Sequence, residues 1–261
     1  MFYFSYAGNK RKELKEIEEL LSKIKYKKVV EPFGGSLAFT IDQYYKNKDL
    51  EFYPSDIDNE LTLFCNNFYK HDDIIIKKLL EIIKNISNKE DYDKLYKKSI
   101  SKIQEENIVD FMTYYLFKKT CYAIRPGLYY LDRSPKLTNV LKYKNKLNDF
   151  FKDHKYNNIH YKYVFKQFYN DEDAIIFLDP PYLNSVYSFY DKFDETDFSY
   201  LWEDICDMLE NAKCKIILIV NDNFFMKKCY NKWFYKQYEK KYRYHSSKKT
   251  YHNIFTNIKL D

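Results

Sequence analysis

A short apolar run that ends on an acid and two prolines constrains this chain more than any other feature. The run spans Ala174 to Leu178, and the next residues are Asp179, Pro180, Pro181 and Tyr182. Such a run is typical of a buried strand, and open α/β sheets bind ligands outside the carboxyl ends of their strands. Because proline has no N–H, this strand end presents acceptors beside an aromatic face. The combination suits a flat ligand with an exocyclic amine, such as adenine; the alternative is a stiff turn without a ligand.

A second strand end carries a glycine turn. Val29 and Val30 read as a short strand, and the residues that follow are Glu31, Pro32, Phe33, Gly34, Gly35 and Ser36. The chain has only 4 glycines, whereas average usage would give about 18. We therefore expect the remaining glycines where the backbone needs positive φ or lies close to a ligand. Asp56 ends the next strand, about 20 residues further on, where dinucleotide sites place the acid that binds ribose hydroxyls.

Composition excludes several classes of protein. Hydrophobic residues make up 45% of the chain, which supports a packed core, and the formal charge of +6 permits nucleic-acid binding without demanding it. No apolar run approaches the roughly 18 residues of a membrane span, and the amino terminus does not resemble a signal peptide. The five cysteines have neither disulfide nor zinc-site spacing. We expect an intracellular protein with no membrane and no metal partner.

Strand and helix patterns alternate at both ends of the chain and give way to helices in the middle. The predicted fold class is α/β: a mostly parallel sheet from residues 1–61 and 157–261, a terminal antiparallel hairpin, and a mostly helical insertion at 62–156. Predicted helices cover residues 9–25, 36–45, 74–86, 103–122, 137–151 and 197–211. Predicted strands cover residues 29–30, 51–56, 159–164, 174–178, 215–220, 236–243 and 252–259.

Four motifs in a fixed order resemble those of Dam-type DNA adenine-N6 methyltransferases, especially their compact phage and viral branch. They are Tyr-Ala-Gly-Asn-Lys at 6–10, the glycine turn at 31–36, Asp56, and Asp-Pro-Pro-Tyr at 179–182. The resemblance implies a Rossmann-like class I methyltransferase sheet, S-adenosylmethionine as cofactor, double-stranded DNA as substrate, and a target-recognition role for the helical insertion. It also implies a cognate restriction endonuclease as a partner where such an enzyme serves a restriction-modification system.

Carried over residue by residue, the resemblance assigns a cofactor site. Tyr6 and Lys10 would contact the methionine part of the cofactor, and Asp56 its ribose. Phe165, placed after the strand expected at Ile159, would contact its adenine ring, and Gln167 stands where the family usually has an acid. The full set of cofactor residues is Tyr6, Lys10, Glu31, Phe33, Gly34, Gly35, Asp56, Phe165 and Asp179.

The same resemblance assigns the catalytic residues Asp179, Pro180, Pro181 and Tyr182. Asp179 and the Pro180 carbonyl would accept hydrogen bonds from the target amine, while Tyr182 stacks on the flipped base. Acceptors that hold the amine favour a transition state in which the nitrogen gains positive charge.

Three competing hypotheses concern the substrate and the activity: cytosine N4 in DNA, adenine in RNA, and a catalytically silent DNA-binding partner subunit. Cytosine-N4 enzymes more often have Ser in place of Asp179, and protein glutamine methyltransferases usually have Asn there. The presence of both Asp179 and Tyr182 favours an active enzyme over a silent subunit. Adenine N6 in double-stranded DNA is therefore the acceptor that we expect.

Five residues are candidates for DNA binding: Arg125, Arg133, Arg243, Ser246 and Lys248. Arg125 resembles the arginine that opens the family's recognition hairpin and reads guanine through O6 and N7. For Arg125 the alternative is phosphate contact or plain solvation. Arg243, Ser246 and Lys248 suit phosphate contacts, and the alternative for them is an ordinary exposed hairpin tip. After Arg125 the chain lacks the Asn/Gly/Phe/Pro/Gly pattern usual in enzymes that methylate GATC, so the resemblance does not extend to that target sequence.

Overall fold

The computed structural model describes residues 2–4, 10–86, 90–91, 93–95, 107–121, 137–182, 195–240 and 250–259. The chain divides into two compact units, each described by itself below. Lys10–Asn59 and Asn157–Asp261 form the sheet unit, and Met1–Asn9 and Glu60–Tyr156 form the helical unit. The described residues 2–4 are thus grouped with the helices, whereas the sequence prediction placed residues 1–61 with the sheet.

Within the described residues, the sheet unit contains seven strands in the order β3-β2-β1-β4-β5-β7-β6. Strands β3, β2, β1, β4 and β5 run parallel, whereas β7 is antiparallel to both β5 and β6. This confirms the predicted α/β class and its terminal antiparallel hairpin. The strands are β1 (Lys28–Glu31), β2 (Glu51–Asp56), β3 (Asn157–Asn158), β4 (Ala174–Leu178), β5 (Lys215–Asn221), β6 (Phe234–Lys240) and β7 (Thr250–Thr256).

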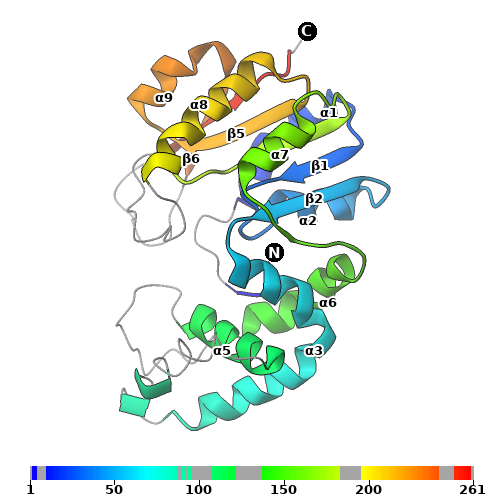
Figure 1. Cartoon of the computed structure of the whole chain (residues 1–261), viewed down its shortest axis with the longest axis vertical. Coiled ribbons are helices and arrows are strands. Elements are labelled where there is room, and N and C mark those ends of the chain that lie inside the picture. The colour runs from blue at the N-terminus through cyan, green and yellow to red at the C-terminus, as the bar shows by residue number, and fades with distance from the viewer. Residues whose placement is uncertain are drawn as a thin grey trace. The chain divides into compact units, whose positions relative to one another are not determined.

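Helices cover both faces of the sheet. In Figure 1, α7 (Tyr161–Phe168) and α8 (Glu195–Asn211) cross the near face of the strands. On the other face, Phe39 of α2 (Ala38–Lys46) stacks on Phe177 of β4 with ring centroids 4.7 Å apart. The remaining short helices are η1 (Leu14–Glu16), α1 (Glu18–Ser22), α9 (Phe224–Cys229) and η3 (Asn231–Trp233).

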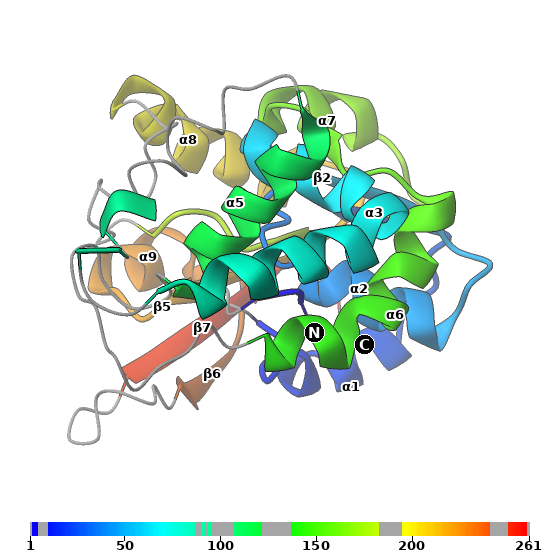
Figure 2. The same ribbon diagram turned by 90° about the horizontal axis from the view of Figure 1, so that it is seen from below.

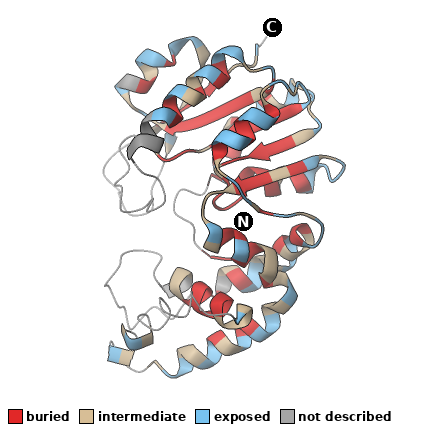
Figure 3. Cartoon of the chain, viewed as in Figure 1, coloured by how far each residue is buried: buried red, intermediate tan, exposed pale blue. Residues whose placement is uncertain are grey.

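The two central strands are buried on both faces. Every residue of β4 is buried, and so are the five central residues of β5, as Figure 3 shows in red. Ile176 and Leu178 pack with α7 and α8 in one hydrophobic cluster, while Phe177 points to α2. This burial explains why these strands read as continuous apolar runs without alternation.

The prediction of a strand at residues 159–164 is wrong. Strand β3 has only two residues, and α7 begins at Tyr161, where the His160 side chain caps the helix by accepting the Lys162 N–H at 3.3 Å. The aromatic residues here suggest a strand because aromatic side chains favour pleated surfaces. Their burial follows a helix instead: the buried positions of α7 are Tyr161, Val164, Phe165 and Phe168, which recur at helical spacing.

Other boundaries differ from the predictions by smaller amounts. The helix expected over residues 9–25 is reduced to η1 and the five-residue α1, although the predicted apolar positions Leu14, Ile17 and Leu20 are buried. Both strands of the terminal hairpin begin two residues earlier than predicted, at Phe234 and at Thr250. The predicted helix before β5 is confirmed as α8.

Three longer helices form the core of the helical unit: α3 (Asn59–Lys84), α5 (Ile108–Cys121) and α6 (Thr138–Asp153), seen together in Figure 2. The buried Tyr3 lies among them, with ring contacts to Phe68 of α3 at 4.6 Å and Phe151 of α6 at 6.3 Å. Phe4 contacts Tyr115 of α5 at 6.1 Å. The N-terminal residues therefore complete this core. Among the described helices of the chain, none has the length and apolarity needed to cross a membrane.

Candidate active site

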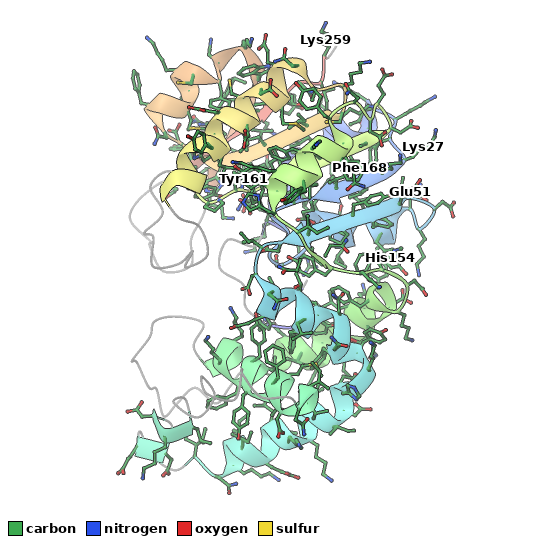
Figure 4. The ribbon with its side chains drawn as sticks, in the orientation of Figure 1. Lys27, Glu51, His154, Tyr161, Phe168 and Lys259 are labelled. Atoms are coloured by element: carbon green, nitrogen blue, oxygen red, sulfur yellow. The ribbon has the colours of Figure 1, made fainter. Side chains whose placement is uncertain are left out.

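Acidic groups gather at the carboxyl edge of the parallel strands. Glu31 and Asp56 are the last residues of β1 and β2, and Asp179 directly follows β4. The strand order reverses between β1 and β4, which are neighbours in the sheet. A parallel α/β sheet opens a crevice for a ligand at such a reversal. Figure 4 marks the opposite edge, where Lys27 and Glu51 lie near the starts of β1 and β2.

The glycine turn after β1 is bonded to the end of β2. The Gly35 N–H donates to Asp56 Oδ2 at 2.9 Å, and the Asp58 N–H donates to Asp56 Oδ1, also at 2.9 Å. Gly35 has a φ of 46° and Leu37 a φ of 51°, a left-handed conformation that costs a non-glycine residue free energy. The turn is therefore joined to the end of β2 through the Asp56 carboxylate.

Glu31 is a buried acid behind this turn. The Thr40 N–H at the start of α2 donates to Glu31 Oε2 at 2.9 Å. Burial raises the pKa of Glu31, hydrogen bonds from Thr40 and Phe39 lower it, and the negative charge of Asp179 adds to the rise, so that the net pKa is about 7. Below neutral pH the side chain is thus largely protonated, and a cation bound nearby would favour its ionised form.

Lys10, Asp179 and Tyr182 form one contact group. The Lys10 ammonium pairs with Asp179 Oδ2 at 2.5 Å, although the lysine side chain is only 4% exposed and Asp179 is 20% exposed. The Tyr182 hydroxyl donates to Asp179 Oδ1 at 3.3 Å, and the Lys10 ammonium lies 5.2 Å from the centre of the Tyr182 ring. Two motifs separated by 169 residues of sequence therefore meet at one carboxylate.

An aromatic side chain of the glycine turn packs against the start of α7. The Phe33 ring lies 5.5 Å from that of Tyr161, which lies 4.6 Å from the His160 imidazole. Figure 4 shows Tyr161 at the carboxyl-edge end of α7 and Phe168 at its far end. Phe165 lies one turn into α7 and is 5% exposed within the hydrophobic cluster. The residue that follows β3 is Ile159, which is 38% exposed.

The remaining predicted site residues lie beside Asp179, in the glycine turn, or outside the described residues. Pro180 and Pro181 are buried beside Asp179, and Gly34 is buried in the glycine turn. Tyr6, Arg125, Arg133, Arg243, Ser246 and Lys248 lie outside the described residues. Among the described residues, no group of three or more His, Cys, Asp or Glu side chains could hold a metal ion.

Sequence reasoning missed two residues beside this group. His252 of β7 contacts the Tyr182 ring at 5.6 Å, and Glu13 lies 3.3 Å from His252 Nδ1. Neither residue belongs to a motif. Only their burial as polar residues, 1% and 2% exposed, identifies them.

Comparison with known proteins gives two findings. The family model described as D12 class N6 adenine-specific DNA methyltransferase matches residues 6–253. The chain is also similar to the Type II methyltransferase M.CviBI of Paramecium bursaria Chlorella virus NC1A. The two are 25% identical over 252 residues, which cover 92% of this chain and 90% of the viral protein.

Proposed function

This chain belongs to the D12 class N6 adenine-specific DNA methyltransferases, and we propose that it transfers the methyl group of S-adenosylmethionine to a flipped adenine in double-stranded DNA. Membership of the family implies an adenine in DNA as the acceptor and a methyl donor as the co-substrate. The observation that carries the finer proposal is the contact group of Lys10, Asp179 and Tyr182 at the carboxyl edge, next to the glycine turn. It combines an amine acceptor with an aromatic face, as adenine N6 requires.

The residues around the glycine turn fit the proposed cofactor. S-adenosylmethionine supplies an electrophilic methyl group, which the N6 nitrogen takes with the loss of one proton. Asp56 would accept hydrogen bonds from the ribose hydroxyls of the cofactor while keeping the hydrogen bond from the Gly35 N–H. Glu31, Phe33, Gly34 and Tyr6 complete the binding surface in this proposal. Glu31 supports it electrostatically, because ionising a buried acid beside a cationic cofactor is favourable.

We revise one assignment within this proposal. The role of Phe165 depended on a strand that does not form, and its buried place in α7 separates it from the strand end. Ile159 and His160 directly follow β3, and Ile159 exposes apolar surface there. We therefore propose that Ile159 and His160, rather than Phe165, contact the adenine ring of the cofactor.

The contact group suggests how the target amine enters. Lys10 holds Asp179 Oδ2 at 2.5 Å, whereas the Tyr182 hydroxyl reaches Oδ1 at 3.3 Å, beyond the usual range for such a bond. The weaker contact at Oδ1 is the one that the N6 amine would replace, with the Pro180 carbonyl accepting the second hydrogen. The Tyr182 ring then stacks on the base. Ionised Asp179 stabilises the positive charge that develops on the nitrogen.

DNA recognition is assigned to the helical unit and to the chain's basic residues. The formal charge of +6 favours binding to phosphates. We propose that Arg125 reads a base and that Arg133, Arg243, Ser246 and Lys248 contact the backbone. Because the viral relative is named a Type II methyltransferase, we also propose that this enzyme acts in a restriction-modification system with a cognate endonuclease, inside the cell that holds the DNA.

The test is direct identification of the product. The purified protein is incubated with labelled S-adenosylmethionine and unmethylated AT-rich DNA, which is then hydrolysed to nucleosides and separated by mass. We expect N6-methyladenine that is absent with Asp179→Ala. Methylcytosine, or methylation of RNA in place of DNA, would overturn the proposal. The exposed pair of Asp173 with Lys27, at the other end of β4, provides the matched control: Asp173→Ala should retain activity.

A further inference from the structure

A buried polar cluster lies directly behind the contact group. We call it the His252 cluster; its members are Glu13, Tyr238, Lys240 and His252. His252 is 1% exposed, Glu13 is 2% and Tyr238 is 9%. Burying this many polar groups is costly unless they bond to one another, so the cluster indicates a specific role.

Glu13 holds the cluster together. Its carboxylate accepts a hydrogen bond from the Tyr238 hydroxyl, pairs with the Lys240 ammonium, and lies 3.3 Å from His252 Nδ1. Tyr238 and His252 are register partners on β6 and β7, and their rings lie 5.7 Å apart. The imidazole therefore lies beside the Glu13 carboxylate and contacts the Tyr238 ring.

His252 in turn holds the Tyr182 ring. The two ring centroids are 5.6 Å apart at an interplanar angle of 88°, an edge-to-face arrangement that aromatic pairs prefer. Glu13 is also linked to the contact group through the backbone, because its N–H donates to the Lys10 carbonyl at 2.8 Å. The hydroxyl of Tyr182 is therefore constrained by Asp179, and its ring by Lys10 and His252.

The imidazole is held neutral by its surroundings. Burial and the charges of Lys10 and Lys240 lower the pKa of His252, and Asp179 opposes them, so that the net pKa is about 3. Glu13, Tyr182 and Tyr238 are further titratable groups that face it. At neutral pH the ring therefore packs against Tyr182 without placing a positive charge beside the site where N6 becomes positive.

We propose that His252 is a positioning residue for methyl transfer, which sets the orientation of Tyr182 on which the target adenine stacks. This inference rests on the proposed function, because it needs Tyr182 to stack on the flipped base. A ring that is fixed before the base arrives loses less conformational freedom when stacking occurs. An edge-to-face contact of this kind corresponds to about a 3- to 10-fold effect.

Two substitutions separate ring packing from the chemistry of the imidazole nitrogens. His252→Ala removes the ring, whereas His252→Phe keeps a ring of similar size and removes the nitrogens. We expect His252→Ala to lower kcat about tenfold while the KM for S-adenosylmethionine stays unchanged, and His252→Phe to restore most of kcat. Phe234→Ala is the matched control, because it removes an exposed ring from the same hairpin at the end that packs on Phe255.

A spectroscopic measurement excludes a merely structural role. DNA with 2-aminopurine at the target adenine reports stacking of the flipped base through its fluorescence. We expect brighter fluorescence with His252→Ala than with the wild type or His252→Phe, because a misoriented Tyr182 quenches the base less. All variants are compared below their melting temperatures.

The outcomes distinguish this inference from the proposed function. If the wild type forms no N6-methyladenine, the proposed function fails and the inference fails with it. If the wild type is active and His252→Ala has the same kcat and fluorescence, only the inference is overturned. Equal losses of kcat in His252→Ala and His252→Phe would also overturn it, because kcat would then not depend on the presence of a ring.

Discussion

The two halves of the carboxyl edge are constructed differently. On β1 and β2, the Gly35 N–H of the glycine turn donates to the Asp56 carboxylate, which lies 21 residues further along the chain. On β4, Asp179 and Tyr182 are held by side chains of Lys10 and His252, which come from distant parts of the chain. The first half therefore joins a main-chain donor to one carboxylate, and its turn contains the positive φ of Gly35. The second half depends on contacts between side chains from distant parts of the chain.

This difference predicts different responses to mutation. In the proposed site the first half contacts the cofactor and not the target amine, so substitutions there should weaken cofactor binding and leave the chemistry intact. A half held by side chains loses its geometry with one of them, so substitutions there should lower kcat. Four measurements test the comparison, and each could contradict it.

The largest effect is expected from Asp179→Ala. Removing the acceptor of the target amine should lower kcat by about 10³-fold, as removal of a preorganised group at a developing charge does in other enzymes. Cofactor affinity, measured by calorimetry, should change by less than about tenfold. Because Lys10 would lose a partner while only 4% exposed, the double variant Lys10→Met/Asp179→Ala serves as a folding control. Wild-type kcat in Asp179→Ala would contradict the assignment.

Asp56→Ala should act on binding instead. The variant removes the carboxylate that accepts hydrogen bonds from the Gly35 N–H and, in the proposed site, from the ribose hydroxyls of the cofactor. The cofactor Kd should therefore rise about 100-fold. At saturating cofactor, kcat should stay within about threefold of the wild type. Glu51→Ala, at the start of the same strand, is the matched control. A fall in kcat with unchanged Kd would erase the distinction between the two halves.

The pKa of Glu31 predicts a pH dependence of cofactor binding. With a pKa of about 7, the carboxyl is mostly ionised at pH 8 and mostly protonated at pH 6. Since a cationic cofactor favours the ionised form, affinity should fall about tenfold between these pH values. Calorimetry in buffers of different ionisation enthalpy should show a proton released on binding near pH 7. In Glu31→Gln both effects should vanish; their persistence would assign them to another group.

The smallest expected effect is on the free energy of unfolding, and it comes from His252, which contacts Tyr182. His252 has a pKa of about 3 when folded and an ordinary value of 6.5 when unfolded. The unfolded chain therefore takes up a proton first as pH falls, and the stability at neutral pH is lost progressively from about pH 6.5 toward pH 3. Between pH 7 and 5.5 this loss is about 1 kcal/mol. Urea unfolding of His252→Phe should show a flatter pH dependence than the wild type; identical slopes would refute it.

Local sequence patterns were enough to predict most helices and strands and the glycine turn and acid of the β1 and β2 half of the carboxyl edge. The apolar runs of β4 and β5, the glycine turn and the acid at the end of β2 all lie where their patterns predicted. The segment after β3 failed because an aromatic-rich run satisfies both a strand and a helix, and packing against the sheet selected the helix α7. That error also misplaced Phe165.

The sequence by itself determined the class of fold and the family, and it supplied the short motifs that we propose as the site, because each motif consists of residues close together in the chain. Tertiary structure alone decided that Lys10 pairs with Asp179 and that His252 and Glu13 lie behind Tyr182. These contacts join segments that are far apart in the chain, and no periodicity or spacing links such positions. They arise only when the parallel strands and the antiparallel β7 bring those segments to one edge of the sheet.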